Sequence, residues 1–142
     1  WRFHCDILHS FPATNAVVHV HSTYATALAC LGEGIPAFHY MVAMAGGADI
    51  PCAPYATFGT PELSANILNA LHERKACLMA NHGQVATGRT LADAYALAQE
   101  VENLARQYML ARSLGPTRNL SGDEMARVIE KFRSYGQQRS DD

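Results

Sequence analysis

Three histidines in this sequence of 142 residues have spacings that suit a metal site. His19 and His21 stand two residues apart in the run 16–21, which is short, apolar and β-branched and therefore predicts a buried strand. Residues two apart on a strand point to the same face, so both imidazoles leave one side of it. His82 follows a second apolar run, 76–80, and precedes a glycine, where a side chain can project into a crevice. Three histidines with an open fourth position are typical of a catalytic zinc site.

The residues alone leave a structural explanation for these histidines open. Two imidazoles on one strand face could hydrogen-bond within the core or face water. The tripeptide Asn81-His82-Gly83 is more often a turn than a ligand, and the spacing alone does not bring His82 to the other two histidines. The remaining histidines receive no ligand role: His4, His9, His39 and His72.

The lysines argue mildly against a covalent alternative. A Schiff-base enzyme needs a lysine with a lowered pKa in an apolar pocket. The chain has only Lys75, in the charged run Glu73-Arg74-Lys75, and Lys131, beside Glu130. Both positions indicate solvated side chains, so the composition favours metal chemistry over imine chemistry.

The elements that must position the histidines alternate between helices and strands. Strands are predicted at 16–21, 76–80 and 84–87, and residues 36–40 are predicted to be extended. Residues 50–55 carry two prolines, which suits a loop or an edge strand. Helices are predicted over 1–11, 23–31, 90–113 and 121–135, and another from Thr60-Pro61-Glu62 onward. The fold class is therefore α/β, with helices packed on a mostly buried sheet.

The composition excludes several other classes of protein. Hydrophobic residues make up 49% and charged residues 17%, which supports a packed core and excludes wholesale disorder. The net charge of -2 provides no basic excess for a phosphate backbone, so no nucleic-acid partner is expected. No apolar run approaches the roughly 18 residues of a membrane span and no signal segment opens the chain, so no membrane partner is expected.

The cysteines indicate a reducing compartment. They are widely spaced and form no CxxC pair, so thiolate zinc ligation is disfavoured. We expect them to be reduced and mostly buried, which favours a cytoplasmic location. The four positions are Cys5, Cys30, Cys52 and Cys77.

Several segments of the chain resemble one known family. The stretch NAVVHVHS, residues 15–22, resembles the zinc-binding strand of class II aldolases of the aldolase/adducin superfamily. Residues 35–41, 46–47 and 50–60 resemble the L-fuculose-phosphate aldolase branch, and KFRSYG, residues 131–136, resembles the C-terminal end of that branch. The similarity runs through nearly all of the chain. It implies a single class II aldolase/adducin-like domain over residues 1–142, with three layers and a central sheet flanked by helices, incomplete at its N-terminus.

The resemblance implies a reaction and a cofactor. Asn81-His82-Gly83 matches the third histidine of the family, so His19, His21 and His82 match its zinc ligands, with one zinc per chain. The implied reaction is zinc-dependent cleavage of L-fuculose 1-phosphate to dihydroxyacetone phosphate and L-lactaldehyde through a metal-stabilised enediolate. The expected substrate is therefore a small phosphorylated sugar.

Four aromatic residues match further parts of the family's site. Tyr40 matches a proton-donating tyrosine at a neighbouring subunit's site, and Tyr135 matches a C-terminal tyrosine that helps close the site. Phe58 and Phe132 match apolar walls near the methyl group of the aldehyde. The family forms cyclic tetramers with sites between subunits, so a homotetramer is implied. Without the resemblance, Tyr40 would be interpreted as a half-buried aromatic residue, Phe58 as an aromatic residue of a loop and Phe132 as a core residue of a helix.

The sequence departs from the family at its start. The family's proton-abstracting glutamate belongs to a Ser-Ser-Glu segment immediately before the position of Trp1, and its phosphate-binding residues lie further upstream. Asp6, on the first helix, and Glu33, in a Gly-Glu-Gly turn, do not match that pattern. We expect the chain to be part of a longer protein. Loss of a general base alone costs about 10²–10⁴-fold in rate, so the 142 residues are expected to catalyse poorly.

Two other functions are weighed against the aldolase. One is a sugar-phosphate epimerase of the L-ribulose-5-phosphate 4-epimerase type, which would use the same zinc ion and enediolate chemistry. The segment Asn81-His82-Gly83-Gln84-Val85, however, resembles the aldolase branch. The other is a non-catalytic, adducin-like assembly module, which is expected to lack the histidine set that this chain retains.

Overall fold

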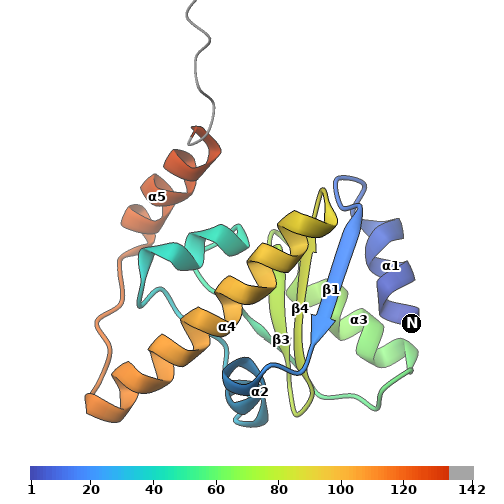
Figure 1. The fold of residues 1–142 in the computed structure, drawn as a ribbon, viewed down its shortest axis with the longest axis horizontal. Coiled ribbons are helices and arrows are strands. Elements are labelled where there is room, and N and C mark those ends of the chain that lie inside the picture. Colours follow the sequence, from blue (N-terminus) through green and yellow to red (C-terminus); the bar gives the residue numbers. More distant parts are fainter. Residues whose placement is uncertain (135–142) are drawn as a thin grey trace, which may run out of the picture.

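The computed structural model describes residues 1–134 and has helices and strands in alternation (Figure 1). The elements in chain order are α1 (Arg2–Ser10), β1 (Ala16–Val20), α2 (Thr23–Cys30), the 3-10 helix η1 (Tyr40–Ala45), β2 (Cys52–Ala53), α3 (Pro61–Ala70), β3 (Ala76–Met79), β4 (Gly83–Gly88), α4 (Leu91–Leu114) and α5 (Gly122–Ser134). The predicted α/β class is confirmed. Within residues 1–134, no helix is both long and apolar enough to span a membrane.

The strands form one sheet in the order β1-β4-β3-β2. β4 pairs antiparallel with β1 and with β3, whereas β2 pairs parallel with β3. The register sets Val20 opposite Gln84, so the end of β1 lies beside the start of β4. This pairing brings the two histidine-bearing segments to the same end of the sheet.

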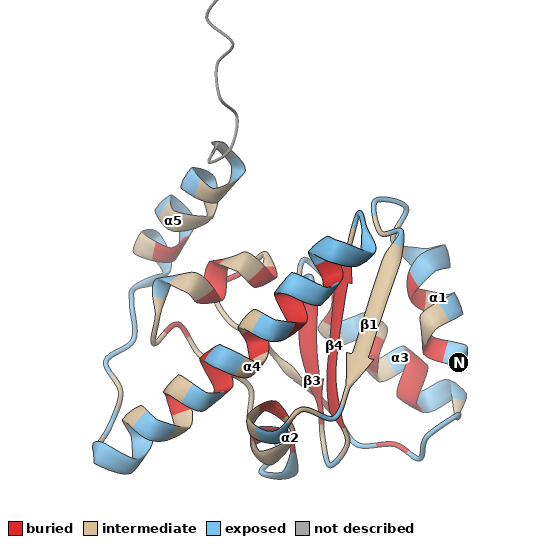
Figure 2. Ribbon diagram, in the orientation of Figure 1, coloured by how far each residue is buried: buried red, intermediate tan, exposed pale blue. Residues whose placement is uncertain are grey.

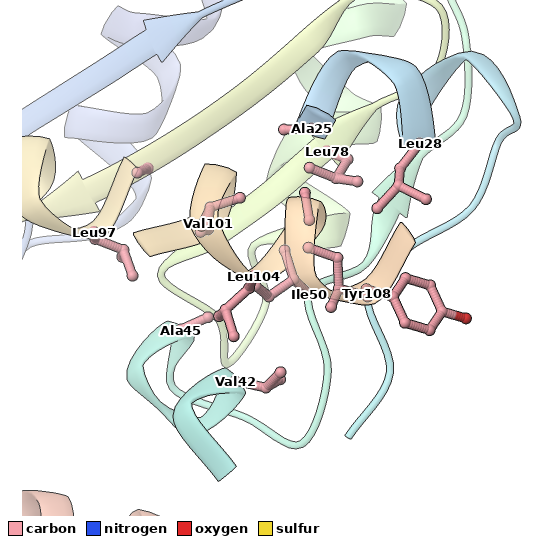
Figure 3. Packing of buried hydrophobic residues seen from close by; sticks show 14 of the residues in the cluster. Ala25, Leu28, Val42, Ala45, Ile50, Leu78, Leu97, Val101, Leu104 and Tyr108 are labelled. Atoms are coloured by element: carbon pink, nitrogen blue, oxygen red, sulfur yellow. The ribbon is translucent and has the colours of Figure 1, made fainter. Parts of the chain in front are cut away.

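Helices cover both faces of the sheet and produce two separate hydrophobic clusters. Along β3, side chains alternate: Leu78 belongs to the α4-side cluster, with residues of α2, η1, α4 and α5, and Met79 belongs to the α3-side cluster, with residues of α1 and α3. Figure 2 shows β3 and β4 as the most buried strands. In Figure 3, Val101 and Leu104 of α4 point into the same cluster as Leu78 and Val42. The architecture is therefore the expected three-layer arrangement.

Local capping explains where the two central helices begin. The Thr60 hydroxyl accepts a hydrogen bond from the Leu63 amide at the start of α3, and Pro61 occupies the first helical position. Thr90 and Asp93 form a reciprocal capping box at the start of α4. Both predicted helix starts are confirmed.

Two expectations about local structure are wrong. Residues 36–40 are not extended, because after a single bridge between Ile35 and Ile50 the chain turns into η1. η1 buries Val42 and Ala45 against α4, and Nδ1 of the N-cap residue His39 accepts a hydrogen bond from the Met41 amide. The four cysteines are free, as expected, but they are not mostly buried: Cys77 is buried and Cys52 partly so, whereas Cys5 and Cys30 lie on the outer surfaces of α1 and α2.

Candidate metal centre

Three imidazoles converge at one end of the sheet. His19 belongs to β1, His21 follows β1 directly, and His82 lies in the tight turn between β3 and β4. Their possible ligand nitrogens all lie within 4.8 Å of one another, and their ring centroids are 4.8, 4.9 and 5.0 Å apart. The structure thus brings together the three histidines that the sequence singled out.

The turn at His82 depends on two unusual backbone positions. Asn81 adopts a positive φ of 54°, a conformation that asparagine tolerates better than most residues. At Gly83, a Cβ atom would lie 2.6 Å from the Val20 carbonyl oxygen and 2.9 Å from Cδ2 of His21. Only a glycine therefore lets the end of β1 approach this turn, and that approach puts His82 beside His21.

The main chain fixes the orientation of the His19 ring. Nδ1 of His19 donates to the Gln84 carbonyl oxygen at 2.9 Å, so Nε2 carries the lone pair and faces Nε2 of His21 at 3.1 Å. Two nitrogens bound to one tetrahedral zinc at its usual bond lengths lie about 3.3 Å apart. The donor set therefore fits a divalent cation between these rings.

Burial favours the neutral form, which binds metal, in two of these rings. Burial lowers the pKa of His19, and the charge of a protonated His21 would lower it further, while the hydrogen bond to the Gln84 carbonyl acts in the opposite direction. Burial also lowers the pKa of His82, with smaller contributions from its two histidine neighbours. A neutral imidazole is the ligand form, so fewer protons must be displaced on metal binding.

Helix α1 forms an apolar wall beside His19. The ring of Phe3 meets His19 edge-on at 5.4 Å, and His4 stacks on Phe3 at 4.2 Å. Burial lowers the pKa of His4, whose buried Nδ1 has no hydrogen-bond partner among the described residues. The sequence analysis gave His4 no role, and its position against His19 depends on helix packing that no local pattern reports.

Carboxylates of the described chain do not join the cluster. Asp6 accepts a hydrogen bond from Ser64 and pairs with Arg2, and Glu33 pairs with Arg112. Neither acid approaches the three histidines in residues 1–134, as their sequence contexts predicted.

Two of the predicted aromatic residues, Tyr40 and Phe132, lie apart from the histidines. Tyr40, at the start of η1, is 49% exposed and stacks in parallel on Phe132 of α5, with 6.4 Å between ring centroids. Figure 1 shows α5 on the opposite side of the molecule from α1. Phe58 is 80% exposed in the loop after β2, and Tyr135 lies outside the described residues. Within residues 1–134, the chain therefore does not bring Tyr40 or Phe132 to its own histidines.

A buried polar network behind the histidines was missed by the sequence analysis. The Gln84 side chain is fully buried in β4, and its amide nitrogen donates to the Ser22 hydroxyl at 2.8 Å and to the Ala98 carbonyl at 3.1 Å. Glu102 of α4 accepts hydrogen bonds from the Tyr24 amide at the start of α2. A glutamine inside an otherwise apolar strand was the available signal, because such a group needs buried partners.

Comparison with known proteins identifies relatives of this chain. Residues 1–109 match the family model described as class II aldolase and adducin N-terminal domain. A 5-methylthioribulose-1-phosphate/5-deoxyribulose-1-phosphate aldolase of Rhodospirillum rubrum is 59% identical over 136 residues, which are 96% of this chain and 62% of the relative. The L-fuculose phosphate aldolase of Escherichia coli is 50% identical over 137 residues, which are 96% of this chain and 64% of the relative.

A solved structure shares the fold closely. It is an L-fuculose 1-phosphate aldolase with a TM-score of 0.90 and 43% identity, covering 94% of this chain and 62% of that one. The chain thus spans less than two thirds of the length of each of these relatives.

Proposed function

The chain belongs to the class II aldolase and adducin family, as its sequence motifs predicted, and from this premise we propose that His19, His21 and His82 hold one zinc ion in a sugar-phosphate aldolase. The observation that carries the proposal is the convergence of three imidazole donors at one end of the sheet. The hydrogen bond from Nδ1 of His19 to the Gln84 carbonyl leaves the Nε2 lone pair directed toward His21. Both lysines of the chain are exposed, which argues against an imine mechanism.

The zinc ion, when bound, supplies a Lewis acid that stabilises negative charge developing on substrate oxygens. The chain's own residues hold and shield it. The Gln84 carbonyl keeps the His19 ring in one tautomer, and Phe3 with His4 covers one side of that ring. Tyr40 is proposed to donate a proton to the aldehyde oxygen and Tyr135 to close the site. Phe58 and Phe132 are proposed to form apolar walls near the methyl group of the aldehyde.

Metal content tests the site directly on the 142-residue chain. After loading with zinc and extensive dialysis, elemental analysis is expected to give about one zinc per chain. His82→Ala should reduce the zinc content to near zero, because the two remaining imidazoles, of His19 and His21, hold zinc only weakly. His72→Ala, which changes an exposed histidine in the turn after α3 that does not belong to the cluster, is the matched control and should retain the metal. A metal-free chain whose ligand variants also have unchanged properties would favour the adducin-like assembly module instead.

The reaction is proposed for a chain of the relatives' full length. We infer cleavage of L-fuculose 1-phosphate to dihydroxyacetone phosphate and L-lactaldehyde, in support of which the E. coli L-fuculose phosphate aldolase is 50% identical. Cleavage is measured by coupled reduction of the released dihydroxyacetone phosphate. Activity on L-ribulose 5-phosphate without release of that product would point to the epimerase reading.

A second substrate is favoured by a specific observation. The 5-methylthioribulose-1-phosphate/5-deoxyribulose-1-phosphate aldolase of R. rubrum is 59% identical, more than the E. coli L-fuculose phosphate aldolase. All three sugar 1-phosphates would release the same phosphorylated ketone and differ in the aldehyde. Ranking their kcat/KM values in parallel decides between fucose degradation and a deoxypentulose or methylthiopentulose substrate.

We further propose a homotetramer whose sites lie between subunits. In support of this, Tyr40 is exposed, stacked on Phe132, and distant from the histidines of its own chain. Mixing full-length Tyr40→Phe and His82→Ala proteins should restore part of the activity, because some mixed sites then contain both intact residues. Failure of every mixture to exceed its parents would count against a shared site. The cytoplasmic location inferred from the cysteine pattern stays a prediction.

A further inference from the structure

One buried residue connects the segments that carry the three histidines. Gln84 has an exposed fraction of 0%, and the other buried polar side chains of the described chain are Ser64 and Thr87. Its position in β4 is two residues after His82. Its main-chain carbonyl accepts the hydrogen bond from Nδ1 of His19.

The side chain of Gln84 connects this strand to the segment after His21. Its amide nitrogen donates to the hydroxyl of Ser22, at 2.8 Å, and to the carbonyl of Ala98 in α4, at 3.1 Å. The Ala98 carbonyl can only accept, so the nitrogen of the amide must face it. Gln84 therefore ties β4 both to α4 and to the residue that immediately follows a metal-ligating histidine.

Ser22 is available to Gln84 because another residue caps the helix. Ser22 occupies the N-cap position of α2, where a serine hydroxyl normally accepts an amide of the first turn, but it makes no such bond. The carboxylate of Glu102 accepts the Tyr24 and Ala25 amides instead. The hydroxyl of Ser22 is thus left to receive the Gln84 amide.

This arrangement is costly for the fold. The Oε1 atom of Gln84 is buried and has no hydrogen-bond partner among the described residues. A buried acceptor without a partner destabilises the native state, and an unbranched apolar side chain of similar volume would avoid that penalty. The amide therefore calls for an explanation other than stability.

We infer that Gln84 is a positioning residue for the metal centre, which holds His21 in register with His19 and His82 through Ser22. The inference rests on the proposed metal-binding function. Gln84 has no part in ligation, because its amide nitrogen points to Ser22 and α4 and its side chain leaves the face of the sheet opposite to His19.

The test compares two isosteric changes on the same strand of the 142-residue chain. Gln84→Met removes the amide, and Thr87→Val removes the buried hydroxyl that donates to the Lys75 carbonyl at the far end of the sheet. Cobalt(II) is the probe, because its visible spectrum reports ligand geometry while a titration reports affinity. Loss of a group hydrogen-bonded directly to a ligand typically weakens metal affinity about 10–100-fold, and the Gln84 amide acts one step further out, through Ser22, so a loss near the lower end of that range is expected. We expect that loss and an altered cobalt spectrum for Gln84→Met, and neither for Thr87→Val, with folding of both verified by circular dichroism.

Ser22→Ala provides a milder second variant in case Gln84→Met fails to fold. Ser22→Ala should also weaken cobalt binding, whereas Ser22→Thr, which keeps the hydroxyl, should bind cobalt like the unaltered chain. The double variant with Gln84→Met and Ser22→Ala should bind cobalt no more weakly than Gln84→Met alone, because both changes remove the same hydrogen bond. Cobalt binding by Gln84→Met or Ser22→Ala within about twofold of the unaltered chain, with the same spectrum, would overturn the inference while leaving the metal site intact. An unaltered chain that binds no cobalt would overturn the proposed function and this inference with it.

Discussion

At the scale of single residues, the site depends on where the main chain lies. A strand pattern was enough to place His19 and His21 on one face, and the structure agrees. The sequence did not establish that His82 would join them, because the approach depends on the missing side chain of Gly83 and on the antiparallel register of β1 with β4. Gln84 was overlooked because its partners are 62 and 14 residues away along the chain.

Gly83→Ala tests whether this close approach assembles the site. The added Cβ would lie 2.6 Å from the Val20 carbonyl oxygen, so β1 and the turn must separate. We expect a loss of roughly 1–3 kcal/mol in the free energy of unfolding from the steric conflict, together with weaker cobalt binding. Urea denaturation and a cobalt titration measure the two effects. Gly122→Ala is the matched control, since an added Cβ there meets nothing within 4 Å. Equal cobalt affinity in both variants would contradict the role given to Gly83.

The buried histidines predict how the metal-free chain responds to acid. Burial lowers the pKa of His19 and His82 in the native state, so the unfolded chain binds more protons than the native chain just below the ordinary histidine pKa. The free energy of unfolding should therefore fall as the pH decreases from about 7 to 5. Urea denaturation with a chelator present, at several pH values, measures this slope. His82→Gln should flatten the slope and His72→Gln should not; parallel curves for all three proteins would contradict the assignment.

At the scale of elements, prediction succeeded where contacts between residues close in the sequence set the start of a helix. Thr60 with Pro61, and Thr90 with its capping box, mark helix starts by contacts within four residues, and both were located from the sequence. η1 was not predicted, because its shape is set by distant partners. Val42 packs into the α4-side cluster and α5 packs on the helix from a segment about 80 residues away.

The hydrogen bonds that Glu102 of α4 accepts from the start of α2 are expected to stabilise the fold. Its carboxylate accepts the amides of Tyr24 and Ala25, which would otherwise be unsatisfied at the start of α2. Glu102→Ala should lower the free energy of unfolding by about 1–2 kcal/mol. Glu102→Gln should lower it less, since an amide oxygen still accepts. Asn103→Ala, at an exposed neighbouring position of α4, is the control in the same urea denaturation series. A loss in Asn103→Ala as large as that in Glu102→Ala would attribute the effect to α4 itself.

At the scale of the whole molecule, both hydrophobic clusters of residues 1–134 include side chains of the same sheet. The α4-side cluster contains Leu104 and the α3-side cluster contains Ile67, and each is almost fully buried. His19 leaves the sheet on the α3 side, where Phe3 of α1 meets it, whereas Gln84 leaves the sheet on the α4 side. The geometry of the site therefore depends on the packing of both faces.

This shared sheet predicts a single cooperative unfolding transition. Leu104→Ala and Ile67→Ala should each lower the free energy of unfolding by about 2–5 kcal/mol, because each leaves a cavity in a close-packed cluster. Since the two residues lie in different clusters and share no partner, the losses should add within about 0.5 kcal/mol in the double variant. Urea denaturation followed by far-ultraviolet circular dichroism and by tyrosine fluorescence should give coincident curves for each protein. If Ile67→Ala instead melted α1 and α3 in a separate early transition, the histidine face would be an independently unstable layer. Cobalt affinity would then fall in Ile67→Ala and remain unchanged in Leu104→Ala.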